Sequence, residues 1–186
     1  MIKSYIPKRM MISKIKQNIR SKILSLSISK IFKKNRQKTN EKINVLEFGP
    51  GYGDLAKELV NAFNIKNYYF IDHSQENLEH IRDNIKIKNV HCICHDANHL
   101  ISNVLEENFD IVISSHVIEH LKEPEKHLKD FSNLMNINGL GLISTPNLDS
   151  IDAINLGMDW RGYKDEAHIS LMSYEELEKL ILDKNF

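Results

Sequence analysis

Two spacings of apolar residues alternate along residues 43–147. Short apolar runs predict buried strands, and apolar residues three or four positions apart predict amphipathic helices. Strands are expected at residues 43–48, 68–72, 90–94, 109–114 and 140–144. Helices are expected at residues 53–64, 74–85, 100–105 and 124–134, with a turn at 136–139 before the last strand. Strands that alternate with helices predict an α/β fold with a doubly wound, mostly parallel sheet.

The first apolar run ends in three glycines, Gly49, Gly51 and Gly53, directly before a helical pattern. A strand, a tight turn and a helix open many nucleotide-binding sheets, and glycine lets a ligand approach the main chain. A nicotinamide dinucleotide site would need its third glycine at position 54, where Asp54 stands. A carboxylate there would repel the pyrophosphate, so this pattern disfavours a dinucleotide.

Acidic residues follow several of the expected strands, and with the glycines they make residues 43–147 resemble the class I S-adenosylmethionine-dependent methyltransferases. Glu47 to Gly53 resembles their motif I, Asp72 their ribose-binding acid, and Asp96 with its neighbour the pair that reads the adenine edge. The resemblance implies a Rossmann-like fold with S-adenosylmethionine as the cofactor. It implies cofactor binding by Glu47, Gly49, Gly51, Asp72, His73, Asp96, Ala97 and Ser115.

The segment from Phe109 to Pro124 resembles the subgroup that includes the ubiquinone-biosynthesis O-methyltransferases. That subgroup and the small-RNA 2′-O-methyltransferases carry Glu-x-x-Glu-His, a proposed divalent-metal site. Here His116 replaces the first glutamate, so a site formed by His116, Glu119 and His120 would favour a softer ion than magnesium. A structural cap formed by Glu119 and His120 is the alternative. The resemblance also implies that His120 and His168 face the acceptor, where a histidine suits proton removal.

Two features near the carboxyl end concern the acceptor and the sheet edge. Residues 147–172 stand where the family places an acceptor-covering insertion, and their Trp160 either lines a pocket or packs in the core. The family's last two strands are absent, so strand five is expected at a free edge. Either the sequence is a fragment, or the basic amino-terminal helix or a second copy covers that edge.

Residues 1–42 carry thirteen lysines and arginines and one acid, which leaves 25 − 13 = 12 basic and 25 − 1 = 24 acidic residues elsewhere. We divide the chain into this basic helical extension with its linker and a methyltransferase domain at 43–186. Apolar residues recur at helical spacing in the extension: Ile12, Ile15, Ile19, Ile23 and Leu26. This stripe predicts a membrane-surface or RNA contact, or a helix packed on the acidic domain.

These observations predict a methyltransferase that modifies an oxygen of a small metabolite or a glycan. An RNA 2′-O-methyltransferase is one alternative, favoured by the basic extension. A non-catalytic cofactor-binding subunit or truncated fragment is another, favoured by the missing strands. Cys92 and Cys94 lie two residues apart on one expected strand, so their side chains share a face and cannot easily form a disulfide. This indicates a reduced, cytoplasmic protein, either free or peripheral to the membrane.

Overall fold

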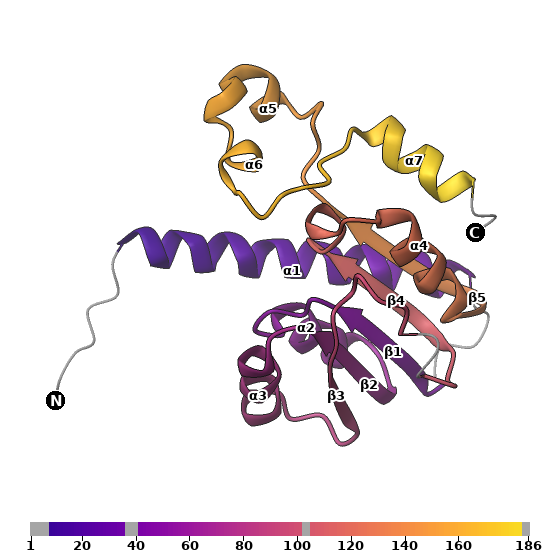
Figure 1. Ribbon diagram of the computed structural model, residues 1–186. Coiled ribbons are helices and arrows are strands. Elements are labelled where there is room, and N and C mark those ends of the chain that lie inside the picture. The colour runs from indigo at the N-terminus through magenta and orange to yellow at the C-terminus, as the bar shows by residue number, and fades with distance from the viewer. Residues whose placement is uncertain (1–7, 36–40, 102–104, 184–186) are drawn as a thin grey trace, which may run out of the picture.

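The computed structural model describes residues 8–35, 41–101 and 105–183. Within these residues, parallel strands form a single five-stranded sheet in the order β3-β2-β1-β4-β5 (Figure 1). The strands are β1 (Ile43–Phe48), β2 (Ile65–Asp72), β3 (Val90–Cys94), β4 (Phe109–Ser115) and β5 (Met135–Ser144). The Rossmann-like α/β fold expected from the sequence is confirmed.

Helices cover both faces of the sheet (Figure 1). The first three are α1 (Lys8–Asn35), α2 (Asp54–Ala62) and α3 (Gln75–Asn84), and their apolar residues share one core with the strands. The later elements are η1 (Ile118–His120), α4 (Pro124–Asn133), α5 (Ile151–Leu156), η2 (Gly157–Asp159), α6 (Arg161–Lys164) and α7 (Tyr174–Leu182). Of these, α4 packs on the opposite face, and α7 packs beside α4.

Alternation along the strands decides which side chains reach which face. In β1, Val45 joins the core beneath α1–α3, whereas Leu46 and Phe48 join the core beneath α4. Glu47 therefore points to the side of α1 and α2. Ser115 lies on the same face of β4 as Ile111 and Ile113, which belong to the core beneath α1–α3, so its hydroxyl also lies on the α1 side.

Two local predictions differ from the structure. The expected turn at 136–139 lies inside β5, where the pairing shifts from Phe109–Met135 to Ile111–Leu140. The extra residues form a bulge, and Asn138 adopts a positive φ of 65° there. The expected helix at 100–105 is not formed at the described positions 100, 101 and 105, and positions 102–104 lie outside the described residues.

The helix α1 docks on the sheet by a different face from the isoleucine stripe. Ser21, Ser25, Ile28 and Phe32 are buried at helical spacing, and the Phe32 ring contacts Phe63 edge to face at 5.4 Å. In contrast, the described side chains of the predicted stripe are exposed to solvent, at Ile19, Ile23 and Leu26. The interpretation that this stripe packs on the domain is therefore wrong for these residues. The side chains of Ile12 and Ile15 lie outside the described part.

Strand β5 is the last strand on its side of the sheet, as expected. The helix α1 contacts β5 from the sheet face, where Leu140 and Leu142 pack against its core, and no described strand pairs with the outer edge. Among the described helices, none has the length and apolar character needed to cross a membrane.

Candidate functional site

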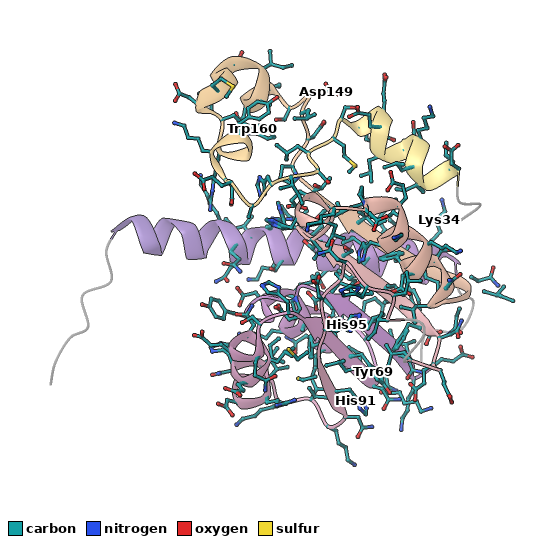
Figure 2. All side chains as sticks on the ribbon, viewed as in Figure 1. Lys34, Tyr69, His91, His95, Asp149 and Trp160 are labelled. Carbon is teal, nitrogen blue, oxygen red and sulfur yellow. The ribbon has the colours of Figure 1, made fainter. Side chains whose placement is uncertain are left out.

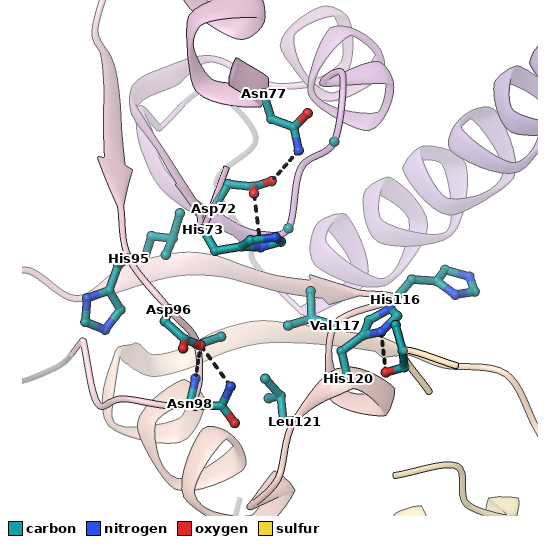
Figure 3. A pocket seen from close by; sticks show the side chains of 15 residues that line it. Asp72, His73, Asn77, His95, Asp96, Asn98, His116, Val117, His120 and Leu121 are labelled. Carbon is teal, nitrogen blue, oxygen red and sulfur yellow. Dashed lines mark hydrogen bonds and ion pairs between the residues drawn. The ribbon is translucent and has the colours of Figure 1, made fainter. Parts of the chain in front are cut away.

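The strand order reverses beside β1, because β2 and β3 extend to one side of it and β4 and β5 to the other. Ligands bind at such a switch point, beyond the carboxyl ends of the strands. A cavity of about 560 Å³ opens there (Figure 3). Its lining includes six of the eight cofactor-binding residues expected from the sequence: Gly49, Gly51, Asp72, His73, Asp96 and Ala97.

The glycine turn after β1 lines two neighbouring cavities. Gly49 has a φ of 60°, and a Cβ there would lie 2.5 Å from Val117. Gly51 has a φ of 54° and open space where a Cβ would stand, so a ligand can reach its backbone. The turn is closed by the Gly53 amide, which donates to the Pro50 carbonyl at 2.9 Å.

Asp72 and Asp96 lie at the wall of the larger cavity, after β2 and β3 (Figure 3). Asp72 is buried, and its carboxylate accepts from the Ser74 amide at 2.8 Å and from the Asn77 side chain at 3.2 Å. The Asn98 backbone amide and side chain donate to Asp96, and these bonds hold the pKa of Asp96 below its usual value. Hydrogen bonds thus hold both side chains in place, where their oxygens can accept from hydroxyl or amine donors.

A second cavity, of about 230 Å³, lies on the α1 side of the glycine turn and shares Gly49, Gly51 and His116 with the first. Glu47 and Ser115 line this smaller cavity. Burial raises the pKa of Glu47 to about 7, although the Tyr68 hydroxyl donates to its carboxylate at 2.6 Å. A cation bound beside this carboxyl would favour its ionised form and lower its pKa.

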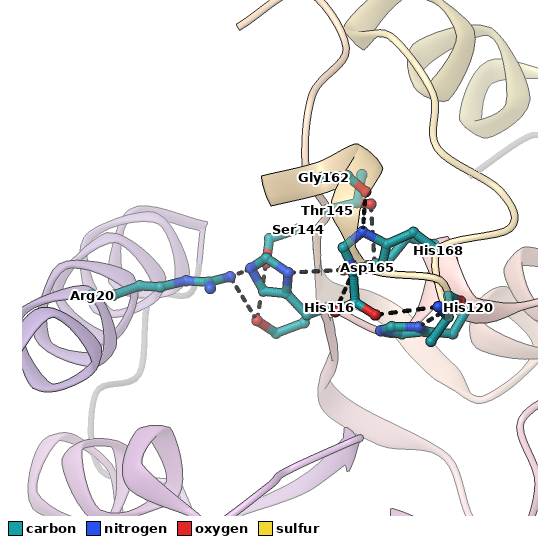
Figure 4. Close-up of polar contacts among 11 residues, drawn as sticks. Arg20, His116, His120, Ser144, Thr145, Gly162, Asp165 and His168 are labelled. Atoms are coloured by element: carbon teal, nitrogen blue, oxygen red, sulfur yellow. Dashed lines mark hydrogen bonds and ion pairs between the residues drawn. The ribbon is translucent and has the colours of Figure 1, made fainter. Parts of the chain in front are cut away.

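Arg20 of α1 enters this smaller cavity (Figure 4). Its guanidinium donates to the Ser144 hydroxyl at 3.0 Å and to the Ser115 hydroxyl at 3.2 Å. Burial lowers the pKa of Arg20 and the charge of Glu119 raises it, but a guanidinium stays protonated in proteins. Arg20 was not predicted from the sequence, because nothing in the motifs indicates that this turn of α1 lies over the ends of β4 and β5.

His116 and Glu119 pair directly after β4. His116 adopts a left-handed φ of 57°, uncommon for a residue with a side chain, while its amide donates to the Ser144 carbonyl at 2.8 Å. Its Nδ1 lies 2.8 Å from a Glu119 oxygen, and the Thr145 hydroxyl donates to the other oxygen at 3.1 Å. Burial raises the pKa of Glu119, but the hydrogen bond from His116 and further contacts outweigh it, so the net shift is downward.

The rings of His120 and His168 lie side by side, with their centroids 4.9 Å apart (Figure 4). Each uses its Nδ1 toward a backbone carbonyl, His120 toward Ala167 at 2.9 Å and His168 toward Gly162 at 2.8 Å. A carbonyl only accepts, so Nδ1 carries the proton in the neutral rings and Nε2 has the lone pair. Nε2 of His168 also lies 3.7 Å from a carboxylate oxygen of Asp165. Both histidines can therefore act as proton acceptors or as metal ligands.

The structure places a different trio together from the predicted His116, Glu119 and His120. Ligand atoms of Glu119, His120 and His168 all lie within 4.8 Å of one another, and His116 acts as a hydrogen-bond partner of Glu119. Two imidazoles and one carboxylate suit a divalent transition ion, and the Nδ1–carbonyl bonds are the support that ligand histidines normally have. The residues thus fit a metal, and they would hold it through His120, His168 and Glu119.

Similarity to known proteins shows which family the chain belongs to. Residues 17–186 match a family described as "Methyltransferase domain". The chain belongs to this family. A malonyl-[acyl-carrier protein] O-methyltransferase of Bacillus anthracis is 28% identical over 110 residues, which are 59% of this chain and 40% of that protein. One from Bacillus cereus is 24% identical over 155 residues, 81% of this chain and 56% of that protein.

The chain thus spans about half the length of the curated relatives it matches. The plantazolicin methyltransferase BpumL, solved in complex with SAH, has a TM-score of 0.71 at 17% identity and covers 96% of this chain and 70% of its own. That likeness supports the fold. The narrower resemblance to the ubiquinone-biosynthesis subgroup is not confirmed, because the curated relatives bear a different name.

The segment expected to cover the acceptor is built around Trp160 (Figure 2). Trp160 is buried, and its ring occupies the space that a Cβ at Gly162 would need. The amides of Ile169 and Ser170 donate to the Glu119 carbonyl at 2.9 and 3.0 Å, which holds His168 beside His120. In this methyltransferase domain Trp160 therefore packs within the covering segment.

Proposed function

We propose that this protein binds S-adenosylmethionine and transfers its methyl group to an oxygen of an acceptor. The observation that carries the proposal is the pair of cavities that share the glycine turn in their linings. One presents two anionic carboxylates, and the other presents a buried carboxyl and a guanidinium. This division matches a ligand with a nucleoside at one end and an amino acid at the other.

In the larger cavity, Asp72 accepts hydrogen bonds from the ribose hydroxyls, and Asp96 accepts one from the adenine amine. His73 and Ala97 line the space beside the base. In the smaller cavity, Arg20 pairs with the carboxylate of the cofactor's amino-acid end. Glu47 faces the ammonium, whose charge favours the ionised form of the carboxyl.

Bound S-adenosylmethionine would supply a methyl group activated by its sulfonium. The domain's own contribution is to hold the acceptor in line with that methyl group, an effect worth about 7–11 kcal/mol in well-oriented systems. For a hydroxyl acceptor, Nε2 of His120 or His168 takes the proton as the oxygen receives the methyl group. A metal held by Glu119, His120 and His168 would instead lower the pKa of the bound acceptor hydroxyl.

An oxygen acceptor is favoured over a nitrogen acceptor because the curated relatives are named O-methyltransferases. Small metabolites and glycans are the acceptor classes we propose. An RNA 2′-hydroxyl is the second candidate, favoured by the lysine-rich helix α1, which has no acidic residue.

Methyl transfer is tested by incubating the protein with isotopically labelled S-adenosylmethionine and separate metabolite, glycan and RNA fractions. Mass spectrometry should find the label in one fraction with the wild-type protein and lose it with Asp72→Asn. Label only in RNA, together with salt-sensitive RNA retention, would favour the second candidate. Cofactor binding without label in any fraction would support a non-catalytic subunit.

A further inference from the structure

The helix α1 has two apolar faces, and only one of them is used inside the molecule. The inner face packs on the sheet through Ile28 and Phe32. On the opposite face Ile19, Ile23 and Leu26 are exposed by 53%, 58% and 71% of their surface. Spacings of four and three residues place these side chains in one row along the helix.

Lysines surround this outer row. Lys16, Lys22, Lys30 and Lys34 are exposed on α1, and the helix contains nine lysines and arginines and no acidic residue. Residues 43–186 have the opposite charge, with 12 basic and 24 acidic residues. The charge is thus divided within one molecule, with the positive part concentrated on the helix that carries the apolar row.

We propose that the outer row of α1, defined as Ile19, Ile23 and Leu26 with the flanking lysines, docks on an anionic lipid surface. Apolar side chains enter the boundary between headgroups and acyl chains, and lysines extend to the lipid phosphates. The acidic remainder is repelled by the same surface, so the molecule is oriented with α1 toward the lipid. RNA phosphates would use the lysines but would leave the apolar row in water.

The position of α1 in the fold fits this contact. Its amino-terminal part projects beyond the sheet and beyond α2 and α3 (Figure 1). The inner face stays on the domain through Ser21, Ser25, Ile28 and Phe32, so lipid contact requires no unfolding. Arg20 lies between the two faces and keeps its bonds to Ser115 and Ser144.

The proposal is tested by flotation of the full chain with vesicles. Vesicles that contain phosphatidylglycerol should retain at least about tenfold more protein than vesicles of phosphatidylcholine alone, and high salt should reduce the retention. The triple variant Ile19→Gln, Ile23→Gln and Leu26→Gln should lose it, because glutamine keeps the helix propensity but removes the apolar row. Lys22→Glu with Lys30→Glu should lose it as well.

Ile151→Gln with Ile154→Gln is the matched control, because these side chains are also exposed and apolar but lie on α5. This control should float like the wild type, and circular dichroism should be the same for all variants. Equal retention by both kinds of vesicle, or an unchanged triple variant, would overturn the proposal. So would a dimer in light scattering that the triple variant dissociates without any vesicle retention, because a second copy would then cover the row.

Discussion

His120 and His168 stand with ring centroids 4.9 Å apart, although one follows β4 and the other lies between α6 and α7. Backbone carbonyls fix both Nδ1 atoms, which leaves the Nε2 lone pair of His120 available, whereas Nε2 of His168 lies 3.7 Å from an Asp165 carboxylate oxygen. If the proposed function holds, His120→Ala should lower turnover by about 10²-fold or more, the usual scale for acid–base help, and leave cofactor affinity nearly unchanged. Labelled methyl transfer and calorimetry measure the two quantities.

The matched control is His91→Ala, which removes an exposed histidine from β3. It should keep wild-type turnover. Wild-type turnover of His120→Ala as well would assign the two histidines to structure alone.

The trio of Glu119, His120 and His168 makes a separate prediction about metal binding. Cobalt(II) should bind the protein and give a visible spectrum typical of a mixed nitrogen and oxygen site, because imidazole and carboxylate suit such ions. His168→Ala should abolish the spectrum, whereas His91→Ala should keep it. A spectrum that survives His120→Ala and His168→Ala would place the ion elsewhere.

The burial of Glu47 predicts how the stability of the free protein depends on pH. The folded carboxyl keeps its proton up to a pKa of about 7, against 4.5 in the unfolded chain. Between these values the unfolded state binds fewer protons, so the unfolding free energy should fall as the pH rises, by about 3 kcal/mol in total from this group.

Glu47→Gln keeps an oxygen that accepts from Tyr68 and removes the charge. Chemical denaturation at several pH values should therefore show a smaller fall for this variant than for the wild type. The same pH dependence in both proteins would mean that Glu47 is ionised without cost in the folded state.

The assignment of Arg20 to the cofactor's carboxylate is tested by two ligands. S-adenosylhomocysteine has the amino-acid end, and 5′-methylthioadenosine lacks it. Arg20→Gln should weaken the binding of S-adenosylhomocysteine by about tenfold or more, the scale of a lost charged hydrogen bond. The affinity for 5′-methylthioadenosine should stay nearly unchanged. Lys22 is two residues after Arg20 and is exposed on α1. The control Lys22→Gln should change neither affinity.

Equal losses for both ligands would show that Arg20 only supports the fold of this region. Loss of both would also be separable from a failure of cofactor binding, because the wild-type protein is measured with the same two ligands.

The residues that follow strands were predictable, whereas those that depend on packing between distant elements were not. Gly49, Asp72 and Asp96 each stand at a strand end, and a parallel sheet brings such ends to one edge. Arg20 reaches the site only because α1 crosses the ends of β4 and β5, and no local pattern indicates that crossing. The sequence also offers two rows on α1 with helical spacing. The structure buries the row with Ser21 and Ser25, whose small side chains let the helix approach closely.

The central claim is that the cavity at the carboxyl edge of the sheet holds S-adenosylmethionine. Isothermal calorimetry with S-adenosylhomocysteine tests it most directly, with Asp72→Asn and Asp72→Ala compared with Asp83→Ala, an exposed acid of α3. We predict binding to the wild type and to Asp83→Ala, weakened by about tenfold or more in both Asp72 variants through the lost ribose hydrogen bonds. Absence of binding to the wild type, or preferential binding of NAD, would contradict the account.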